Sequence, residues 1–271
     1  MLITASQLAA ALASERPPVV LDVRWSLGGP PGHEEYLRGH VPGAVYVDLD
    51  TELAAPAAPT AGRHPLPAAD DLQAGARRWG IDDGDTVVVY DGDGNLAAAR
   101  AWWLLRWAGV AEVLLLDGAL PAWTAAGQPL DTHDVVPAPG TVTLTPGAVP
   151  TIGPDDAGAF EGVLIDARAA ERFRGETEPV DPRAGHIPGA VSVPTTGNLA
   201  ADGRFLPAEE LRARFAAAGA DGTVPVAAYC GSGVTAAHEV AALSIAGIDA
   251  ALYPGSWSQW SNLDLPVATG G

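Results

Sequence analysis

Cys230 is the only cysteine in this chain of 271 residues, and it begins a Gly-rich loop, Cys-Gly-Ser-Gly-Val-Thr, at 230–235. An apolar run at 224–229 precedes the loop, and an Ala-rich, helix-like segment at 236–243 follows it. A strand, a tight loop and a helix in this order direct backbone N–H groups and the positive end of the helix dipole toward the loop. These surroundings favour the thiolate, which is the nucleophilic form of cysteine. The alternative is a buried, inert cysteine, but a Gly-rich turn at a strand end is a poor place to bury a side chain.

The composition excludes several classes of function. The net charge of −18 argues against nucleic acid and anionic membranes as partners. All 15 basic residues are arginines, so Schiff-base and P-loop lysine chemistry is excluded. An anionic substrate must therefore be held by arginine, by backbone amides or by a helix end. One cysteine and six scattered histidines show no metal-ligand spacing, so no metal or other cofactor is expected.

The chain has the features of a cytoplasmic protein. A single cysteine cannot form an intrachain disulfide, and no apolar run approaches the length of a membrane span. No basic residue precedes Arg16, so the N-terminus is a poor signal peptide. Thr4 or Ser6 instead predicts the N-cap of a first helix through Leu8 to Leu12.

The sequence is an internal duplication with a period near 140 residues, and four motifs recur in the same order in both halves. They are an apolar run ending in Asp-x-Arg, a Gly-His-[Val/Ile]-Pro-Gly-Ala-Val turn, an apolar run ending in Tyr before the reactive loop, and a Gly-containing segment ending in Trp. The matched ranges are 19–24 with 163–168, 39–45 with 185–191, 87–92 with 226–231, and 116–123 with 253–260.

The pattern within each half predicts an α/β fold with two tandem domains, each a mainly parallel sheet flanked by helices. Continuous apolar runs at 87–90 and 113–116 are typical of parallel strands buried on both faces. Ala-, Leu- and Arg-rich stretches at 97–108 and 209–218 predict crossover helices. Pro and Gly are concentrated where the halves join. We therefore expect a first domain over 1–135, a linker over 136–150 and a catalytic domain over 151–271.

The two halves differ at the reactive position. Asp91 stands in the first half where Cys230 stands in the second, and both follow a predicted strand at its carboxyl end. A carboxylate cannot supply a sulfur nucleophile, so the first domain is predicted to be inactive. The favoured interpretation of Asp91 is an ordinary turn or N-cap residue.

These motifs resemble the tandem-domain rhodanese family, which includes 3-mercaptopyruvate and thiosulfate sulfurtransferases. The resemblance covers nearly the whole chain, including the Gly-Ser-Trp-Ser-Gln-Trp segment at 255–260. It implies sulfur transfer through a persulfide on Cys230. The neutral loop is similar to that of the mercaptopyruvate enzymes, whereas thiosulfate-using members carry basic residues there. The expected activity is thus transfer of sulfane sulfur from 3-mercaptopyruvate to a thiophilic acceptor, with a thiosulfate:cyanide sulfurtransferase (rhodanese) as the alternative.

The resemblance also implies a proton relay. Ser232 lies two residues after Cys230, and the family's His and Asp match His64 and Asp50 of the first half. By this likeness the active site lies at a cleft between the domains. A solvated loop histidine is the alternative for His64.

Arg172 matches the family arginine that binds a substrate carboxylate. The mercaptopyruvate enzymes have a second arginine shortly after, but here Asp181 falls near that position and Arg183 is the candidate replacement. The loop residues Gly231, Gly233, Val234 and Thr235 are expected to offer amides to the bound sulfur.

The expected partners are a small-molecule donor, either 3-mercaptopyruvate or thiosulfate, and an acceptor such as cyanide, a small thiol or thioredoxin. A phosphatase of the Cys-x5-Arg type is excluded because Ala236 stands where its arginine is needed. A non-catalytic sulfur carrier or thiol redox sensor stays an alternative, although a sensor would need a partner thiol.

Overall fold

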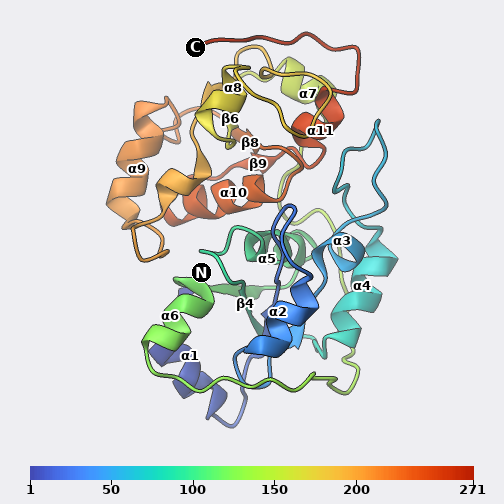
Figure 1. Cartoon of the computed structure of the whole chain (residues 1–271), viewed down its shortest axis with the longest axis vertical. Coiled ribbons are helices and arrows are strands. Elements are labelled where there is room, and N and C mark those ends of the chain that lie inside the picture. The colour runs from blue at the N-terminus through green and yellow to red at the C-terminus, as the bar shows by residue number, and fades with distance from the viewer. The chain divides into compact units, whose positions relative to one another are not determined.

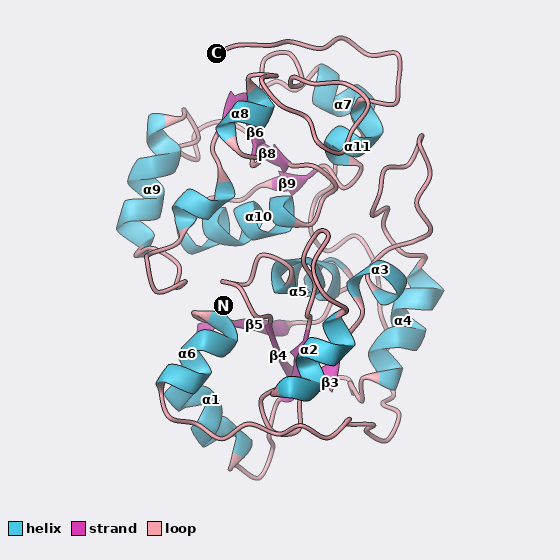
Figure 2. Cartoon of the chain, viewed as in Figure 1, coloured by secondary structure: helices cyan, strands magenta, loops and turns pink.

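The computed structural model describes all residues, 1–271, and divides the chain into two compact units (Figures 1 and 2). Each unit consists mainly of one predicted half together with a short segment from the other half. The first unit comprises Met1–Ala55, Pro67–Ala148 and Ala200–Phe205, and the second comprises Pro56–Leu66, Val149–Leu199 and Leu206–Gly271. Figure 2 shows strands in the interior of each unit with helices around them.

The first unit contains a five-stranded sheet in the order β1-β5-β4-β2-β3, with every neighbouring pair parallel. Crossover connections between parallel strands bury both faces of the sheet, which is why β4 and β5 read as continuous apolar runs. The strands are β1 (Leu2–Ile3), β2 (Val19–Asp22), β3 (Val45–Tyr46), β4 (Thr86–Tyr90) and β5 (Glu112–Leu116).

Six helices cover this sheet. Thr4 caps α1 through a capping box with Gln7, as the sequence predicts. Helix α5, an expected crossover, packs on β4 and β5. The helices are α1 (Ala5–Leu12), α2 (Gly32–Arg38), α3 (Leu49–Glu52), α4 (Ala69–Arg78), α5 (Ala98–Trp107) and α6 (Ala119–Ala125).

The second unit repeats this design with a four-stranded parallel sheet in the order β7-β6-β8-β9. Its strands are β6 (Val163–Asp166), β7 (Val191–Ser192), β8 (Val226–Tyr229) and β9 (Ala251–Leu252). Its helices are α7 (Pro154–Gly158), α8 (Ala170–Phe173), the 3-10 turn η1 (Thr195–Asn198), α9 (Ala208–Ala217), α10 (Thr235–Ile245) and α11 (Ser256–Trp260). The predicted parallel α/β architecture is confirmed in both units.

The repeated Gly-His turns have the same structure in both units. His40 is buried, its Nδ1 lies 3.0 Å from the Tyr36 carbonyl oxygen, and its ring stacks on Tyr36. His186 repeats the arrangement with Phe173, with its Nδ1 2.7 Å from that carbonyl oxygen. A contact present in both halves, with or without a cysteine, is structural. None of the helices is both long enough and apolar enough to cross a membrane.

Candidate active site

Cys230 lies at the carboxyl end of β8, and the loop after it leads directly into α10. The side chain is buried, and the N–H of Gly233 donates to its Sγ at 3.2 Å. The N–H of Cys230 itself donates to Ser256 Oγ at 3.1 Å. A negative charge on the sulfur would therefore face an amide donor and the N-terminus of a helix, both of which stabilise an anion.

The first turn of α11 fixes the shape of the Cys230 loop. Backbone N–H groups of Trp257 and Ser258 donate to the carbonyl oxygens of Cys230 (3.0 Å) and Gly231 (2.8 Å). Gly233 has a φ of +81°, and a Cβ there would collide with the carbonyl oxygen of Pro254. Glycine is needed at this position both for the left-handed conformation and for the close approach of the two backbones.

His64 and Ser232 form a buried pair in the second unit, with His64 Nδ1 2.8 Å from Ser232 Oγ. His64 belongs to the segment Pro56–Leu66, which packs with this unit. Gln259 Nε2 donates to the Thr60 carbonyl oxygen at 2.7 Å, and the N–H of Arg63 donates to Ser258 Oγ at 3.0 Å. These contacts with α11 place the histidine next to the second residue of the loop after Cys230.

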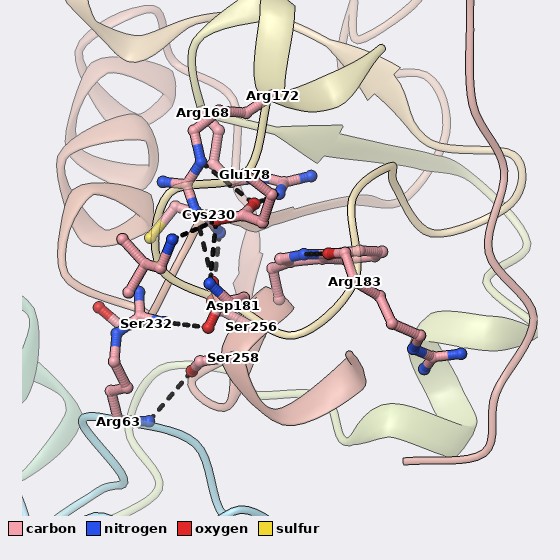
Figure 3. A network of polar contacts seen from close by, with 12 residues as sticks. Arg63, Arg168, Arg172, Glu178, Asp181, Arg183, Cys230, Ser232, Ser256 and Ser258 are labelled. Carbon is pink, nitrogen blue, oxygen red and sulfur yellow. Dashed lines mark hydrogen bonds and ion pairs between the residues drawn. The ribbon is translucent and has the colours of Figure 1, made fainter. Parts of the chain in front are cut away.

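A network of alternating arginines and carboxylates lies beside the Cys230 loop (Figure 3). Arg168 pairs with Asp166 and with Glu178, and Arg172 donates to Glu178 at 2.6 Å. Asp181 lies between Arg172, at 3.3 Å, and Arg63, with which it forms an ion pair. The complete network is Arg63, Asp181, Arg172, Glu178, Arg168 and Asp166, three positive and three negative groups.

Burial and the neighbouring arginines shift the pKa values of Glu178 and Asp181 in opposite directions. Burial tends to raise the pKa of Glu178, but hydrogen bonds from Arg172 and from backbone amides outweigh it and the pKa is lowered. Burial dominates at Asp181 and raises its pKa, although Arg63 and Arg172 oppose the shift. At Asp181 the two arginines therefore limit a rise in pKa that burial causes, but do not reverse it.

Arg183 does not reach the Cys230 loop, and its expected role as the second substrate arginine is wrong. Its guanidinium donates to four backbone carbonyls at and after the end of α11, including Ser261 at 2.8 Å and Leu265 at 2.9 Å. Figure 3 shows its side chain directed away from Cys230. Arginine satisfies several carbonyls at a helix C-terminus well because its donors form a planar fork.

Sequence reasoning missed Arg63, whose guanidinium lies against Gly231. A Cβ placed on Gly231 would be 3.0 Å from Arg63 Nη2 and 3.5 Å from Arg172 Nη1. The only signal for Arg63 was its position next to His64. Val234 is buried at the loop end and Thr235 begins α10, and the expected role of their amides in binding the sulfur stays a prediction.

Asp50 lies in α3 of the first unit, where its carboxylate accepts a hydrogen bond from Trp25 Nε1 at 3.0 Å. Its expected role in a relay stays a prediction.

The loop of the first unit holds the Asp91 carboxylate where the second unit has the Cys230 thiol. The carboxylate accepts hydrogen bonds from the N–H groups of Asp93, Asn95 and Ala97 at 2.8 Å and of Ala98 at 3.0 Å. Burial raises the pKa of Asp91, and these amide donors oppose the shift. The first loop is thus an anion-binding turn whose anion is its own side chain.

Comparisons with known proteins agree with this architecture. The rhodanese-like domain model matches residues 4–126 and 155–263, one range in each half. A Mycobacterium tuberculosis protein named "Putative thiosulfate sulfurtransferase SseB" is 50% identical over 97% of this chain and 94% of its own length. A Pseudomonas aeruginosa protein named "Probable 3-mercaptopyruvate sulfurtransferase" is 47% identical over 99% of this chain and 98% of its own.

The crystal structure of SseA from Escherichia coli, described as a 3-mercaptopyruvate sulfotransferase, superimposes with a TM-score of 0.81 at 32% sequence identity. The match covers 94% of this chain and 98% of SseA. Two matches to one domain model, relatives of similar length and a shared three-dimensional structure lead to a single conclusion: this chain belongs to the rhodanese-like domain family, with two such domains in tandem.

Proposed function

We propose that this protein is a sulfurtransferase that moves sulfane sulfur from 3-mercaptopyruvate to a thiophilic acceptor through a persulfide on Cys230. The observation that carries the proposal is the single cysteine in an amide-lined loop next to a buried Ser–His pair. Relatives at 47% and 37% identity carry the name 3-mercaptopyruvate sulfurtransferase, which supports the same donor.

The chemistry begins with attack of the Cys230 thiolate on the sulfur of the donor. A new S–S bond forms, the donor's C–S bond breaks, and its electron pair goes to carbon as the enolate of pyruvate. The enolate takes up the proton that the donor thiol carried, which leaves pyruvate and an ionised persulfide. An acceptor such as cyanide, a small thiol or thioredoxin then attacks the outer sulfur and restores the thiolate. The persulfide anion is stabilised by the Gly233 amide and the α10 N-terminus.

Ser232 and His64 would move the proton. The Ser232 hydroxyl lies two residues from Cys230, and its oxygen is 2.8 Å from His64 Nδ1, a distance that permits proton transfer. A neutral imidazole can accept a proton from one side and return it as the enolate develops.

The mass of the intact protein tests the persulfide. Incubation with 3-mercaptopyruvate should add one sulfur, about 32 mass units, to Cys230, and cyanide should remove it. Product formation with no change in protein mass would contradict the covalent route. Many sulfurs transferred per chain would establish an enzyme, whereas one per chain would indicate a carrier.

Thiosulfate is the second candidate donor because the Mycobacterium tuberculosis relative at 50% identity carries that name. Its reaction needs no proton, since the Cys230 thiolate displaces sulfite directly. Steady-state kcat/KM with each donor decides between them. We expect the higher value for 3-mercaptopyruvate, because the loop itself carries no cation for a dianion. A higher value for thiosulfate would overturn this choice.

A further inference from the structure

We infer that Ser256 is a positioning residue for the nucleophile, because its hydroxyl holds the backbone of Cys230 in the conformation in which the loop amides face the sulfur. This inference rests on the proposed sulfur transfer and identifies a residue that acts on the reaction through Cys230. Ser256 begins α11, its side chain is buried, and it lies 26 residues after Cys230 in the chain.

The Ser256 hydroxyl connects the ends of two neighbouring strands. Its oxygen accepts the N–H of Cys230 at 3.1 Å (Figure 3), and its proton is donated to the carbonyl oxygen of Tyr253 at 2.8 Å. Cys230 follows β8, and Tyr253 follows β9, the strand that pairs with β8. The N–H of Trp257 holds the other side of the cysteine, since it donates to the Cys230 carbonyl oxygen at 3.0 Å. Consecutive residues of α11 therefore fix both backbone polar groups of the nucleophile.

The first unit contains the same turn without the hydroxyl. Ala119 stands at the equivalent position, with a φ of +53° against +52° for Ser256. In each unit the next residue donates its N–H, at 3.0 Å, to the carbonyl oxygen of the residue at the reactive position. The turn therefore forms with or without a side-chain oxygen. The hydroxyl is a feature of the unit that carries the nucleophile.

The two reactive-position loops are organised in different ways. The Asp91 carboxylate accepts four N–H groups of its own loop, so this loop is held from within. The Cys230 sulfur accepts the N–H of Gly233 at 3.2 Å, and sulfur is a much weaker acceptor than a carboxylate. The Cys230 loop therefore needs contacts from outside to keep its amides directed at the sulfur. Ser256 supplies such a contact at the nucleophile itself.

Loss of the hydroxyl should change the reactivity of the sulfur. The buried N–H of Cys230 would lose its acceptor, and an unpaired buried N–H is costly enough to make the loop shift toward another partner. Such a shift would misalign the Gly233 N–H, which is the donor that stabilises negative charge on Sγ.

Two variants remove the hydroxyl and differ in backbone strain. Ser256→Ala keeps the Cβ and therefore the strained left-handed conformation, whereas Ser256→Gly removes both. Ser256→Gly should therefore unfold at a higher urea concentration than Ser256→Ala and still share its defect in reactivity. If reactivity instead followed stability, so that Ser256→Gly behaved like wild type, Ser256 would be a structural residue only and the inference would be wrong.

Two further variants serve as matched controls. Ala119→Gly relieves the same backbone strain in the first unit. Ser261→Ala removes a buried hydroxyl at the end of α11 that has no hydrogen-bond partner. Both controls should match wild type in reactivity. A defect in either control as large as that of Ser256→Gly would show that loss of the Ser256 hydroxyl is not the cause.

The pH dependence of alkylation by iodoacetamide measures reactivity without turnover, since Cys230 is the only thiol. Access to the sulfur sets the limiting rate, whereas the pH at half of that rate reports how well the loop stabilises the thiolate. We expect this pH to rise by about 0.5 to 1 unit in both Ser256 variants. An unchanged value in both would overturn the inference.

Steady-state kinetics with 3-mercaptopyruvate gives the second readout. We expect kcat to fall about threefold to tenfold in both Ser256 variants and KM to stay within about twofold of wild type, because the lost hydrogen bond acts on the nucleophile. A raised KM with unchanged kcat would place the effect on donor binding and would contradict a positioning role.

The two readouts separate this inference from the proposed function. If wild type gains no sulfur from either donor, yet the Ser256 variants shift the alkylation profile, the sulfurtransferase proposal fails and the positioning role stands. If wild type transfers sulfur, yet these variants change neither kcat nor the alkylation profile, the positioning role is wrong and the sulfurtransferase stands.

Discussion

At the scale of single residues, the chemistry depends on which atoms lie around one sulfur. Cys230 Sγ accepts a hydrogen bond from the Gly233 N–H. The hydroxyl of Ser232, in the same loop, lies within hydrogen-bond distance of His64. Ser232 and Cys230 could be found from the sequence because they share one loop. Arg63 could not, because its ion pair with Asp181 joins positions 118 residues apart and no local pattern marks such a pair.

Replacement of the nucleophile gives the first prediction at this scale. Cys230→Ser should lower sulfur transfer with either donor by about a thousandfold or more, because a serine hydroxyl is a weak nucleophile and cannot store a sulfane sulfur. The free energy of unfolding should stay within about 0.5 kcal/mol of the wild-type value, since the two side chains have similar size. Multiple-turnover activity close to wild type in this variant would overturn the mechanism.

The second prediction concerns the pair formed by Ser232 and His64. Ser232→Ala or His64→Ala should lower kcat for 3-mercaptopyruvate about a hundredfold, because C–S cleavage requires a proton to move. The same variants should lower kcat for thiosulfate much less, since its cleavage needs no proton. Steady-state kinetics with both donors measures the difference, and equal losses would show that the pair acts only on structure or on binding.

At the scale of elements, a strand, a loop and a helix must meet at one point, and the apolar runs of the sequence locate them well. The predicted strands at 87–90 and 113–116 correspond to β4 and β5. The predicted crossover at 209–218 corresponds to α9. Buried parallel strands are continuous apolar runs and amphipathic helices have a periodic apolar pattern, so both kinds of element can be recognised in the sequence. The packing of the first turn of α11 on the Cys230 loop cannot be recognised in this way, because two of its contacts are made by the backbone N–H groups of Trp257 and Ser258, which do not depend on the side chain.

The third prediction tests this loop contact with a matched pair of glycines. Gly233 and Gly189 have φ values of +81° and +86°, but a Cβ on Gly189 meets nothing within 4 Å, whereas one on Gly233 meets Pro254. Gly189→Ala should destabilise the protein by about 1–2 kcal/mol, the cost of the left-handed conformation alone. Gly233→Ala should cost clearly more and should also abolish activity. Urea unfolding measures both, and equal losses would show that the contact with Pro254 contributes nothing.

At the scale of the whole molecule, the predicted division into contiguous halves and the observed units differ in two short segments. Pro56–Leu66 packs with the second unit and Ala200–Phe205 with the first. Most of the stretch expected as a linker at 136–150 also belongs to the first unit, which extends to Ala148, and the N–H groups of Thr141 and Thr143 donate there to Asp82 and Asp83. Composition marks where periodic structure stops, but it carries no information on which surface a non-periodic segment packs against.

The stability of the whole molecule should depend on pH through the buried Glu239. Burial raises the pKa of Glu239 from 4.5 to about 7, although hydrogen bonds from Thr195 and Asn198 favour the charged form. The unfolded chain therefore releases this proton at lower pH than the folded one. The contribution of Glu239 is intact below about pH 4.5 and is lost as pH rises through about 7, a decrease of about 3 kcal/mol in the free energy of unfolding.

The variant Glu239→Gln isolates this effect, because the side-chain amide of glutamine does not titrate but can still form hydrogen bonds. Between pH 5 and pH 8 its free energy of unfolding in urea should fall less than that of wild type. Asp22, whose pKa burial also raises to about 7, remains in both proteins and cancels in the comparison. Parallel curves for the two proteins would show that Glu239 does not titrate in this range.

The Asp91 loop can serve as an internal reference for measurements of charge at the Cys230 loop. Four backbone N–H groups donate to a carboxylate that is part of the chain. The electrostatic surroundings of this loop are therefore the same before, during and after sulfur transfer. In the proposed cycle the Gly233 amide after Cys230 faces a thiolate, then a longer and more diffuse persulfide anion, and then a thiolate again. In an NMR spectrum the amide signals of 231–235 should shift when sulfur is loaded and return when cyanide removes it, while those of 93–98 stay fixed. One chain thus carries, in the same position of its two repeats, a turn that reports the charge on sulfur and a turn that reports none.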